Sequence, residues 1–277
     1  MNTANTTTSF IGQKAQAIRK DIIRSVYLAG SGHPGGSLSS AEIFAVLYFH
    51  EMNIDPEHPQ KEDRDRFVLS KGHCAPAYYA ALAERGYFPV EELDSLRKFG
   101  SMLQGHPDMK HIPGVDMSTG SLGQGVSAAA GMAYGLQIQH NPAHVYALLG
   151  DGELQEGQVW EAAMFAGSKG LNNLTLIIDN NNLQIDGPVD EVNSPYPIDA
   201  KFKAFNFNVE VVDGNDAGAV MTGFANLREK NDRPGVLIAR TTKGKGVSFM
   251  ENQAGWHGKA PNREQMIQAL NDLETEV

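Results

Sequence analysis

The chain has 277 residues, of which 41% are hydrophobic and 20% charged, a composition typical of a soluble enzyme. Its formal net charge of −10 argues against a protein that binds nucleic-acid backbones. Cys74 is the only cysteine, which excludes an internal disulfide framework and fits a cytoplasmic location. No apolar run approaches the roughly 20 residues that span a bilayer, and residues 1–9 lack the apolar core of a signal peptide. We therefore expect a cytoplasmic protein with neither nucleic acid nor membrane as partner.

Apolar residues at helical spacing predict the helices. Phe10–Gly30 is the first, behind a polar tail at residues 1–9. Ser39 or Ser40 is expected to cap a second helix that runs to about Glu51. Further helices are expected after Cys74, from Pro89 to about Gly100, and over 126–139, 156–170, 217–229 and 261–277.

Short apolar runs alternate with these helices and predict strands. The expected strands are Arg66–Ser70, His144–Leu149, Leu174–Asp179, Val209–Val212 and Val236–Arg240. The run Leu174–Asp179 is continuously apolar, as in a strand buried on both faces. Strands that alternate with helices, without a linker or repeat, predict one α/β domain over residues 1–277. We expect a doubly wound, mostly parallel sheet with helices on both faces.

One glycine pattern matches the dinucleotide fingerprint but lies in the wrong context. Gly30-Ser-Gly32-His-Pro-Gly35 fits G-x-G-x-x-G. That fingerprint works after a strand and at the start of a helix, with an acid about 20 residues further on. Here it follows a predicted helix, and Pro34 and Gly36 are expected to delay the next one. A nicotinamide-dependent dehydrogenase is therefore the remote alternative.

Polar residues follow two successive predicted strands, as Gly150-Asp-Gly152 and as Asn180-Asn-Asn182. The carboxyl ends of adjacent parallel strands are where open α/β sheets bind ligands. Carboxylate and amide oxygens suit Mg²⁺, and the glycines let a diphosphate approach the backbone. The pair of segments resembles the thiamine-diphosphate-binding motif. We expect Asp151 and Asn181 as metal ligands, with Asn180 and Asn182 as alternatives to Asn181. The alternative to a binding site is an ordinary turn that contains Asp151, followed by a polar strand end.

Four of the nine histidines lie beside glycines in predicted loops: His33, His73, His106 and His257. Imidazoles titrate near neutrality and hydrogen-bond to phosphates and alkoxides, so we expect these four to handle protons. The alternative for any one of them is an ordinary surface-loop histidine.

A set of motifs occurs in the order found in transketolases. They are Ser31-Gly-His-Pro-Gly35, Ser70-Lys-Gly-His73, Gly105-His-Pro107, Thr119-Gly-Ser-Leu-Gly-Gln-Gly125, Gly150-Asp-Gly-Glu-Leu-Gln-Glu-Gly157, Ile185-Asp-Gly187 and His257-Gly258. Over roughly Phe10–Ala260 the chain resembles the N-terminal, thiamine-diphosphate-binding part of a transketolase. Deoxyxylulose-phosphate synthase shares the Gly-Asp-Gly turn, but the first and fourth motifs point to transketolase.

The resemblance implies roles for individual residues. The metal would be held by Asp151, Asn181 and the Leu183 carbonyl. The cofactor would be bound by Leu122, Gly123, Gly152, Glu156, Asn181, His73 and His257. The ketose hydroxyls would be surrounded by His33, His106 and His257. Glu156, and Glu161 with it, would join a carboxylate network at a subunit interface; a solvated helix face is the alternative.

The resemblance also implies that the site is incomplete. One-chain transketolases have two further domains, and the glutamate that protonates the aminopyrimidine belongs to the second domain. No second apolar domain is visible up to Val277. We therefore expect one subunit of a split transketolase, active with a C-terminal partner subunit in an α2β2 heterotetramer, that moves a two-carbon ketol unit from a ketose phosphate to an aldose. Ser121 departs from the proline usual at its position. Lys243 and Lys245 are expected to be solvated, with assistance to an anion as the alternative.

Three alternative functions remain. The first is a split enzyme for a sulfo- or branched sugar, and the second is a related thiamine-diphosphate synthase. The third is a non-catalytic subunit that only binds cofactor.

Overall fold

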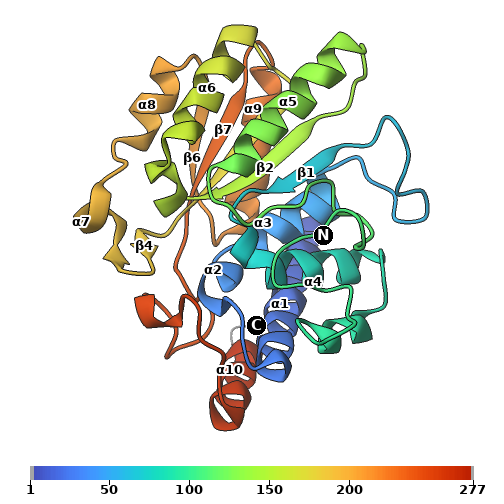
Figure 1. The fold of residues 1–277 in the computed structure, drawn as a ribbon, viewed down its shortest axis with the longest axis vertical. Helices are drawn as coiled ribbons and strands as arrows, with labels where there is room; N and C mark the ends of the chain where they lie inside the picture. The colour runs from blue at the N-terminus through green and yellow to red at the C-terminus, as the bar shows by residue number, and fades with distance from the viewer. Residues whose placement is uncertain (1–2, 276–277) are drawn as a thin grey trace.

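The computed structural model describes residues 3–275, with side-chain burial from Thr6 onward, and its centre is a five-stranded parallel sheet (Figure 1). The strand order is β1-β2-β3-β7-β6. The strands are β1 (Arg66–Leu69), β2 (Val145–Gly150), β3 (Leu174–Asn180), β6 (Asn208–Asp213) and β7 (Gly235–Arg240). Each neighbouring pair is parallel, so the expected doubly wound α/β sheet is confirmed.

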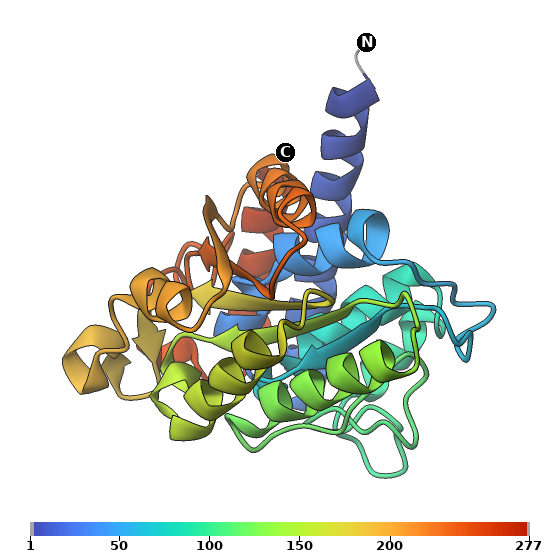
Figure 2. The same ribbon diagram turned by 90° about the horizontal axis from the view of Figure 1, so that it is seen from above.

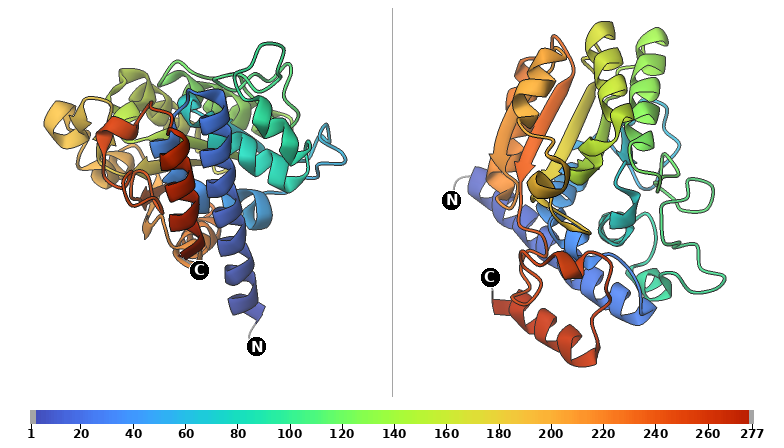
Figure 3. Two further views of the ribbon diagram at one scale, coloured as in Figure 1. Left: turned by 90° about the horizontal axis from the view of Figure 1, so that it is seen from below. Right: turned by 60° about the vertical axis from the view of Figure 1, so that its left-hand side comes forward.

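Helices cover both faces of this sheet (Figure 2). One face carries α5 (Gln124–Ile138), α6 (Gly157–Lys169) and α8 (Ile198–Ala204). The other carries α1 (Thr3–Ala29), α3 (Ala41–Val46), α4 (Ala75–Arg85), α9 (Ala217–Glu229) and α10 (Arg263–Thr275), and α10 lies along α1 (Figure 3). Successive strand residues enter opposite cores: Ile177 packs in the α1 side and Ile178 in the α6 side. This burial on both faces explains the continuously apolar strand sequences.

The chain reverses its direction across the sheet between β3 and β7. Strands β1, β2 and β3 follow one another in space, after which the chain goes to the far edge, β6, and returns through α9 to β7. Gly150 pairs with Asp179, and Asn180 pairs with Arg240, so three strand ends meet at this point. Such a reversal leaves a crevice at the carboxyl ends, where open α/β sheets bind ligands.

The N-terminal predictions need correction. Helix α1 begins at Thr3, so the predicted polar tail is wrong for residues 3–9; residues 1 and 2 lie outside the described part. A helix also begins at Pro34 instead of being delayed, because proline is favoured in the first helical turn. Ser40 is at the N-cap position of α3, as predicted, but makes no side-chain capping bond, because both the Ser39 and the Ser40 hydroxyls donate to the Gly36 carbonyl. The short elements in this region are α2 (Pro34–Leu38) and a π-helical turn, η1 (Leu47–Glu51).

Other short elements differ from expectation or were not expected. The helix predicted from Pro89 is only a 3-10 turn, η3 (Val90–Ser95). The unexpected elements are the antiparallel pair β4 (Leu183–Gln184) and β5 (Gly187–Pro188), and helices α7 (Val189–Asn193) and α8. The remaining 3-10 turns are η2 (Gly72–Cys74), η4 (Gly152–Gln155) and η5 (Ala254–Trp256). Across residues 3–275, none of the helices has both the length and the apolarity required to cross a membrane.

Two helical glycines provide a test of the packing between layers. A Cβ added at Gly167 on α6 would lie 1.8 Å from the Phe205 carbonyl oxygen, whereas one at Gly131 on α5 meets nothing within 4 Å. We expect Gly167→Ala to lower the free energy of unfolding by about 1–3 kcal/mol through overpacking. Gly131→Ala should raise it by up to about 1 kcal/mol through helix propensity. Guanidinium unfolding measures both, and equal effects would contradict the close approach of α6 to residue 205.

Candidate active site

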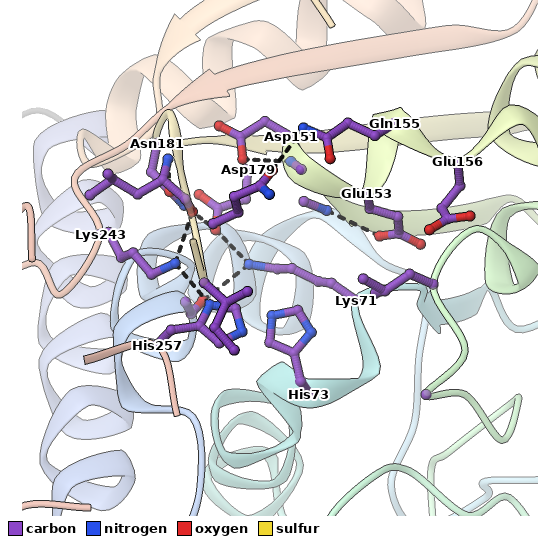
Figure 4. A pocket seen from close by; sticks show the side chains of 18 residues that line it. Lys71, His73, Asp151, Glu153, Gln155, Glu156, Asp179, Asn181, Lys243 and His257 are labelled. Carbon is purple, nitrogen blue, oxygen red and sulfur yellow. Dashed lines mark hydrogen bonds and ion pairs between the residues drawn. The ribbon is translucent and has the colours of Figure 1, made fainter. Parts of the chain in front are cut away.

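A cavity of about 330 Å³ opens at the carboxyl ends of β2 and β3 (Figure 4). Its walls come from the Gly-Asp-Gly turn, the asparagine run, the loop before α5 and the loop after β7. The lining includes Lys71, His73, Gly120, Leu122, Asp151, Gly152, Glu153, Glu156, Asp179, Asn181, Leu183, Lys243 and His257. The two segments singled out from the sequence therefore share one cavity.

Asp151 directly follows β2 and carries a buried carboxylate. Its Oδ1 accepts from the Gly152 backbone N at 2.8 Å, and its Oδ2 accepts from the Asn182 backbone N at 2.5 Å and from Asn180 Nδ2 at 3.0 Å. Burial, and then the neighbouring Asp179 carboxylate, raise the pKa of Asp151 to about 6. A bound cation would favour the ionised form of this carboxylate.

The Asn181 amide is held in one orientation. Its Nδ2 donates to Asp179 Oδ2 at 3.2 Å, and its Oδ1 accepts from the Leu183 backbone N at 3.1 Å. Asn181 lines the cavity, whereas Asn180 is bonded to Asp151 and the Asn182 side chain to Asp190. Of the three candidate asparagines, Asn181 thus has the position expected of a ligand.

The donor set fits a magnesium ion. Asp151, Asn181 and Leu183 offer a carboxylate, an amide oxygen and a backbone carbonyl, the hard oxygens that Mg²⁺ prefers. The Leu183 carbonyl already accepts from the Lys243 ammonium at 2.8 Å. This oxygen therefore already has a positively charged partner, which a metal ion at the site would share or replace.

Three of the four selected histidines pack together. The ring centres of His33 and His73 are 5.3 Å apart, those of His33 and His257 5.4 Å, and those of His73 and His257 5.0 Å. His106 is exposed and lies outside the cavity, against Gly120 and close enough to His33 to affect its charge. The structure therefore assembles a triad, with the fourth histidine beside it.

The triad is electrically neutral at pH 7. Burial and then Arg97 lower the pKa of His33 to about 4, and burial and then Lys243 lower the pKa of His257 to about 3. Burial and then Lys71 hold the pKa of His73 well below its usual value. Each ring can therefore both accept and donate a hydrogen bond, as a proton-handling group requires.

The other predicted residues either line the cavity or lie outside its lining. Leu122, Gly152 and Glu156 line the cavity, and Glu156 is exposed at the start of α6. Gly123 lies behind the wall, where its backbone N donates to Glu153 at 2.9 Å. Glu161 is an exposed residue of α6 outside the lining.

Comparison with known proteins gives the family. Residues 12–274 match the family model described as "Transketolase, thiamine diphosphate binding domain". The chain belongs to this family. It is 45% identical over 263 residues to the 6-deoxy-6-sulfo-D-fructose transketolase subunit SqwG of a Clostridium species, covering 95% of this chain and 96% of that one. It is 40% identical over 279 residues to an apulose-4-phosphate transketolase subunit of Actinobacillus succinogenes, covering 100% of both.

Longer transketolases match over part of their length. The chain is 40% identical over 264 residues to human transketolase, of which it spans 42%. Among solved structures, the transketolase of Campylobacter jejuni superposes with a TM-score of 0.90 at 31% identity, over 99% of this chain and 43% of that one. These matches confirm the predicted thiamine-diphosphate-binding fold and the assignment to thiamine-diphosphate-dependent transferases.

Sequence reasoning missed a buried ion pair under the transketolase cavity. Lys71 Nζ lies 2.5 Å from Asp179 Oδ2, and both side chains are almost fully buried. Lys71 stands in the Ser70-Lys-Gly-His73 motif, which was the one available signal. Asp179 ends an apolar strand and gives no sign of its role without the sheet pairing.

The prediction that Lys243 is solvated is wrong. Its side chain is 2% exposed, and its Nζ lies 2.8 Å from the Leu183 oxygen and 3.0 Å from His257 Nδ1. The loop after β7 turns back onto α2, where the Gly244 N donates to the Gly35 carbonyl at 2.9 Å, and this fold buries the lysine. Lys245 remains at the surface in an ion pair with Glu251.

Removal of the Asp151 carboxylate tests the metal assignment. We expect Asp151→Ala to abolish Mg²⁺-dependent retention of thiamine diphosphate, because the carboxylate is the charged member of the oxygen set. Isothermal titration calorimetry with and without Mg²⁺ measures the cofactor affinity. The control is Asp190→Ala, which removes a nearby carboxylate that accepts a hydrogen bond from the Asn182 side chain. Unchanged cofactor affinity in Asp151→Ala would contradict the assignment.

The low pKa values of the triad predict a pH dependence of stability. His33 has a pKa of about 4 in the folded chain, below its usual 6.5, so only the unfolded chain is extensively protonated there between pH 6.5 and 4. Its contribution is complete above pH 6.5 and is lost as the pH falls towards 4. We expect the free energy of unfolding of His33→Asn to fall less over this range than that of the wild type. Denaturant unfolding at several pH values measures this, and identical slopes would contradict the low pKa.

Proposed function

We propose that this chain is the N-terminal subunit of a two-chain transketolase. With a C-terminal partner subunit, it would transfer a two-carbon ketol unit from a ketose phosphate to an aldose, using thiamine diphosphate and Mg²⁺. The observation that carries the proposal is the meeting of two groups at one cavity. The oxygens of Asp151, Asn181 and Leu183 lie on one side, and His73 and His257 line the other, with His33 packed against both rings outside the lining.

The chain's own residues would bind and orient the cofactor. Asp151, Asn181 and Leu183 would hold the metal, while Gly152 and His73 contact the diphosphate and Leu122 lies against the pyrimidine. Lys243 would supply positive charge beside the diphosphate. When bound, thiamine diphosphate supplies a carbon nucleophile and an electron sink for carbon–carbon cleavage.

The histidines would handle the protons of the sugar. Burial keeps His33 and His257 neutral, so each ring can both donate and accept a hydrogen bond with the ketose hydroxyls and their protons. His33 Nδ1 is buried and, among the described residues, has no hydrogen-bond partner. A substrate hydroxyl would satisfy this nitrogen. His106, at the outer side, would contact the sugar further from the cofactor.

The need for a partner is supported by the lengths of the relatives. Proteins named as transketolase subunits match this chain over nearly all of both sequences, whereas human transketolase is matched over 42% of its length. We therefore propose that residues 1–277 act as a single cofactor-binding domain, that the activating glutamate is on the partner, and that the complex is an α2β2 heterotetramer. Glu156 and Glu161 would face the partner. A cytoplasmic location remains a prediction.

The sugar is a second question. An ordinary pentose phosphate donor is the first candidate, and the 45% identity to a subunit of a sulfofructose transketolase favours a sulfo-sugar as the second. The 40% identity to two apulose-4-phosphate transketolase subunits supports a branched sugar in the same way.

Purification with the native partner tests the split-enzyme proposal. We expect the tagged chain, isolated from its own cells with thiamine diphosphate and Mg²⁺, to carry one partner polypeptide in a one-to-one ratio. The complex should turn over one member of a panel of phosphorylated, sulfonated and branched ketoses. Ketol transfer by the chain alone would overturn the assignment of the activating glutamate to a partner.

His73→Ala tests the assignment of a proton-handling triad. In the complex we expect kcat/KM to fall by about 10²–10⁴, the range of one general acid–base group. His58→Ala, which changes an exposed histidine bonded to Asp55, should leave turnover unchanged. Full activity of His73→Ala would favour the alternative in which this subunit only binds cofactor.

A further inference from the structure

Glu153 is a buried carboxylate of the cavity wall that the proposed mechanism does not use. It follows the Gly-Asp-Gly turn and is 2% exposed. We propose that Glu153 is a positioning residue, which fixes the loop of Leu122 and Gly123 against the end of β2 and so sets the wall on the ring side of the cofactor. This inference rests on the proposed binding of thiamine diphosphate.

The hydrogen bonds of Glu153 join three separate segments. Its Oε1 accepts from the Ser70 hydroxyl after β1 and from the Gly123 backbone N at 2.9 Å. Its Oε2 accepts from the Gly150 backbone N at 3.2 Å, at the end of β2. One side chain, labelled in Figure 4, therefore connects the segment before His73, the loop before α5 and the turn that carries Asp151.

The loop of Leu122 and Gly123 depends on such a connection because it has little side-chain packing of its own. A Cβ at Gly72 would lie 2.7 Å from the Gly120 N, and one at Gly125 would lie 2.7 Å from the Ser70 Cα, so the two backbones touch directly. Leu122 is 37% exposed. The bond from the Gly123 N to Glu153 adds a directional restraint to this close backbone packing.

The same bonds occupy both carboxylate oxygens of Glu153 with backbone donors. Each carboxylate oxygen accepts from a backbone N–H, a group that cannot accept a proton in return. The carboxylate is occupied in holding backbone.

The test compares two probes that share the diphosphate. Glu153→Gln keeps the shape of the side chain but turns an amide NH₂ towards one of the backbone N–H groups. By titration calorimetry on the full chain with Mg²⁺, we expect the affinity for thiamine diphosphate to fall about tenfold or more, as for loss of a hydrogen bond to a charged group. The affinity for inorganic pyrophosphate, which has no rings, should change less than about threefold.

Asp65→Asn is the matched control. Asp65 is also a buried carboxylate that accepts from two backbone N–H groups, those of Asn53 and His144, both at 2.8 Å, but at the opposite end of β1. Asp65→Asn should lower the free energy of unfolding while leaving the affinities for thiamine diphosphate and pyrophosphate unchanged. If Glu153→Gln does not fold, Ser70→Ala removes one donor and should weaken thiamine diphosphate by about 2–5-fold, again more than pyrophosphate.

The outcomes separate the two proposals. Wild-type chain that binds neither probe, alone or with its partner, overturns the proposed function and this inference with it. If the wild-type chain binds both probes and Glu153→Gln loses affinity for both equally, the residue supports the Asp151 turn rather than the loop. Unchanged affinity for both probes would show a purely structural role. Either of these last results overturns the positioning proposal and leaves the proposed function intact.

Discussion

The buried ion pair of Lys71 and Asp179 is the interaction on which the site depends. Lys71 donates to Asp179, to the Ser40 hydroxyl and to the Gly36 carbonyl, and so uses all three of its protons. Asp179 also accepts from Ser39, Thr241 and Asn181. Burying two charges is costly, and the cost is offset only because every donor and most acceptor positions are filled. The pair therefore fixes α2, the ends of β1, β3 and β7, and the Asn181 amide relative to one another.

The charges around this pair suit a metal diphosphate. Burial lowers and Asp179 raises the pKa of Lys71, with a net rise, so the ion pair stays charged beneath the cavity. Burial lowers the pKa of Lys243, whose Nζ donates to the Leu183 carbonyl oxygen in the cavity wall. Asp151 is bonded to neutral donors and has a raised pKa. A ligand that brings both a divalent cation and a dianion complements all of these groups together.

Local patterns predicted the parts of the site that are formed by one segment at a time. Apolar runs bounded by Gly-Asp-Gly and by Asn180–Asn182 placed Asp151 and Asn181 at adjacent strand ends, and glycine neighbours selected His33, His73 and His257. Asp179 and Glu153 could not be found in this way, because their partners come from segments far away in the sequence. Lys243 was misjudged because a glycine-rich loop predicts exposure unless its packing on α2 is known.

The two halves of the cavity differ in what stabilises them. The metal side is built on strand ends within one sheet, and its ligands are fixed by hydrogen bonds to buried groups. The side expected to face the cofactor rings consists of the glycine-rich loop before α5 and Glu156, the residue immediately before α6. Both Leu122 and Glu156 are exposed. The backbone beside Leu122 is held by the bond from the Gly123 N to Glu153, whereas the exposed side chains of Leu122 and Glu156 would be fixed by whatever covers them. Under the proposed function, affinity for the diphosphate would therefore reside in this subunit, whereas reactivity of the ring system would require a partner surface over Leu122 and Glu156.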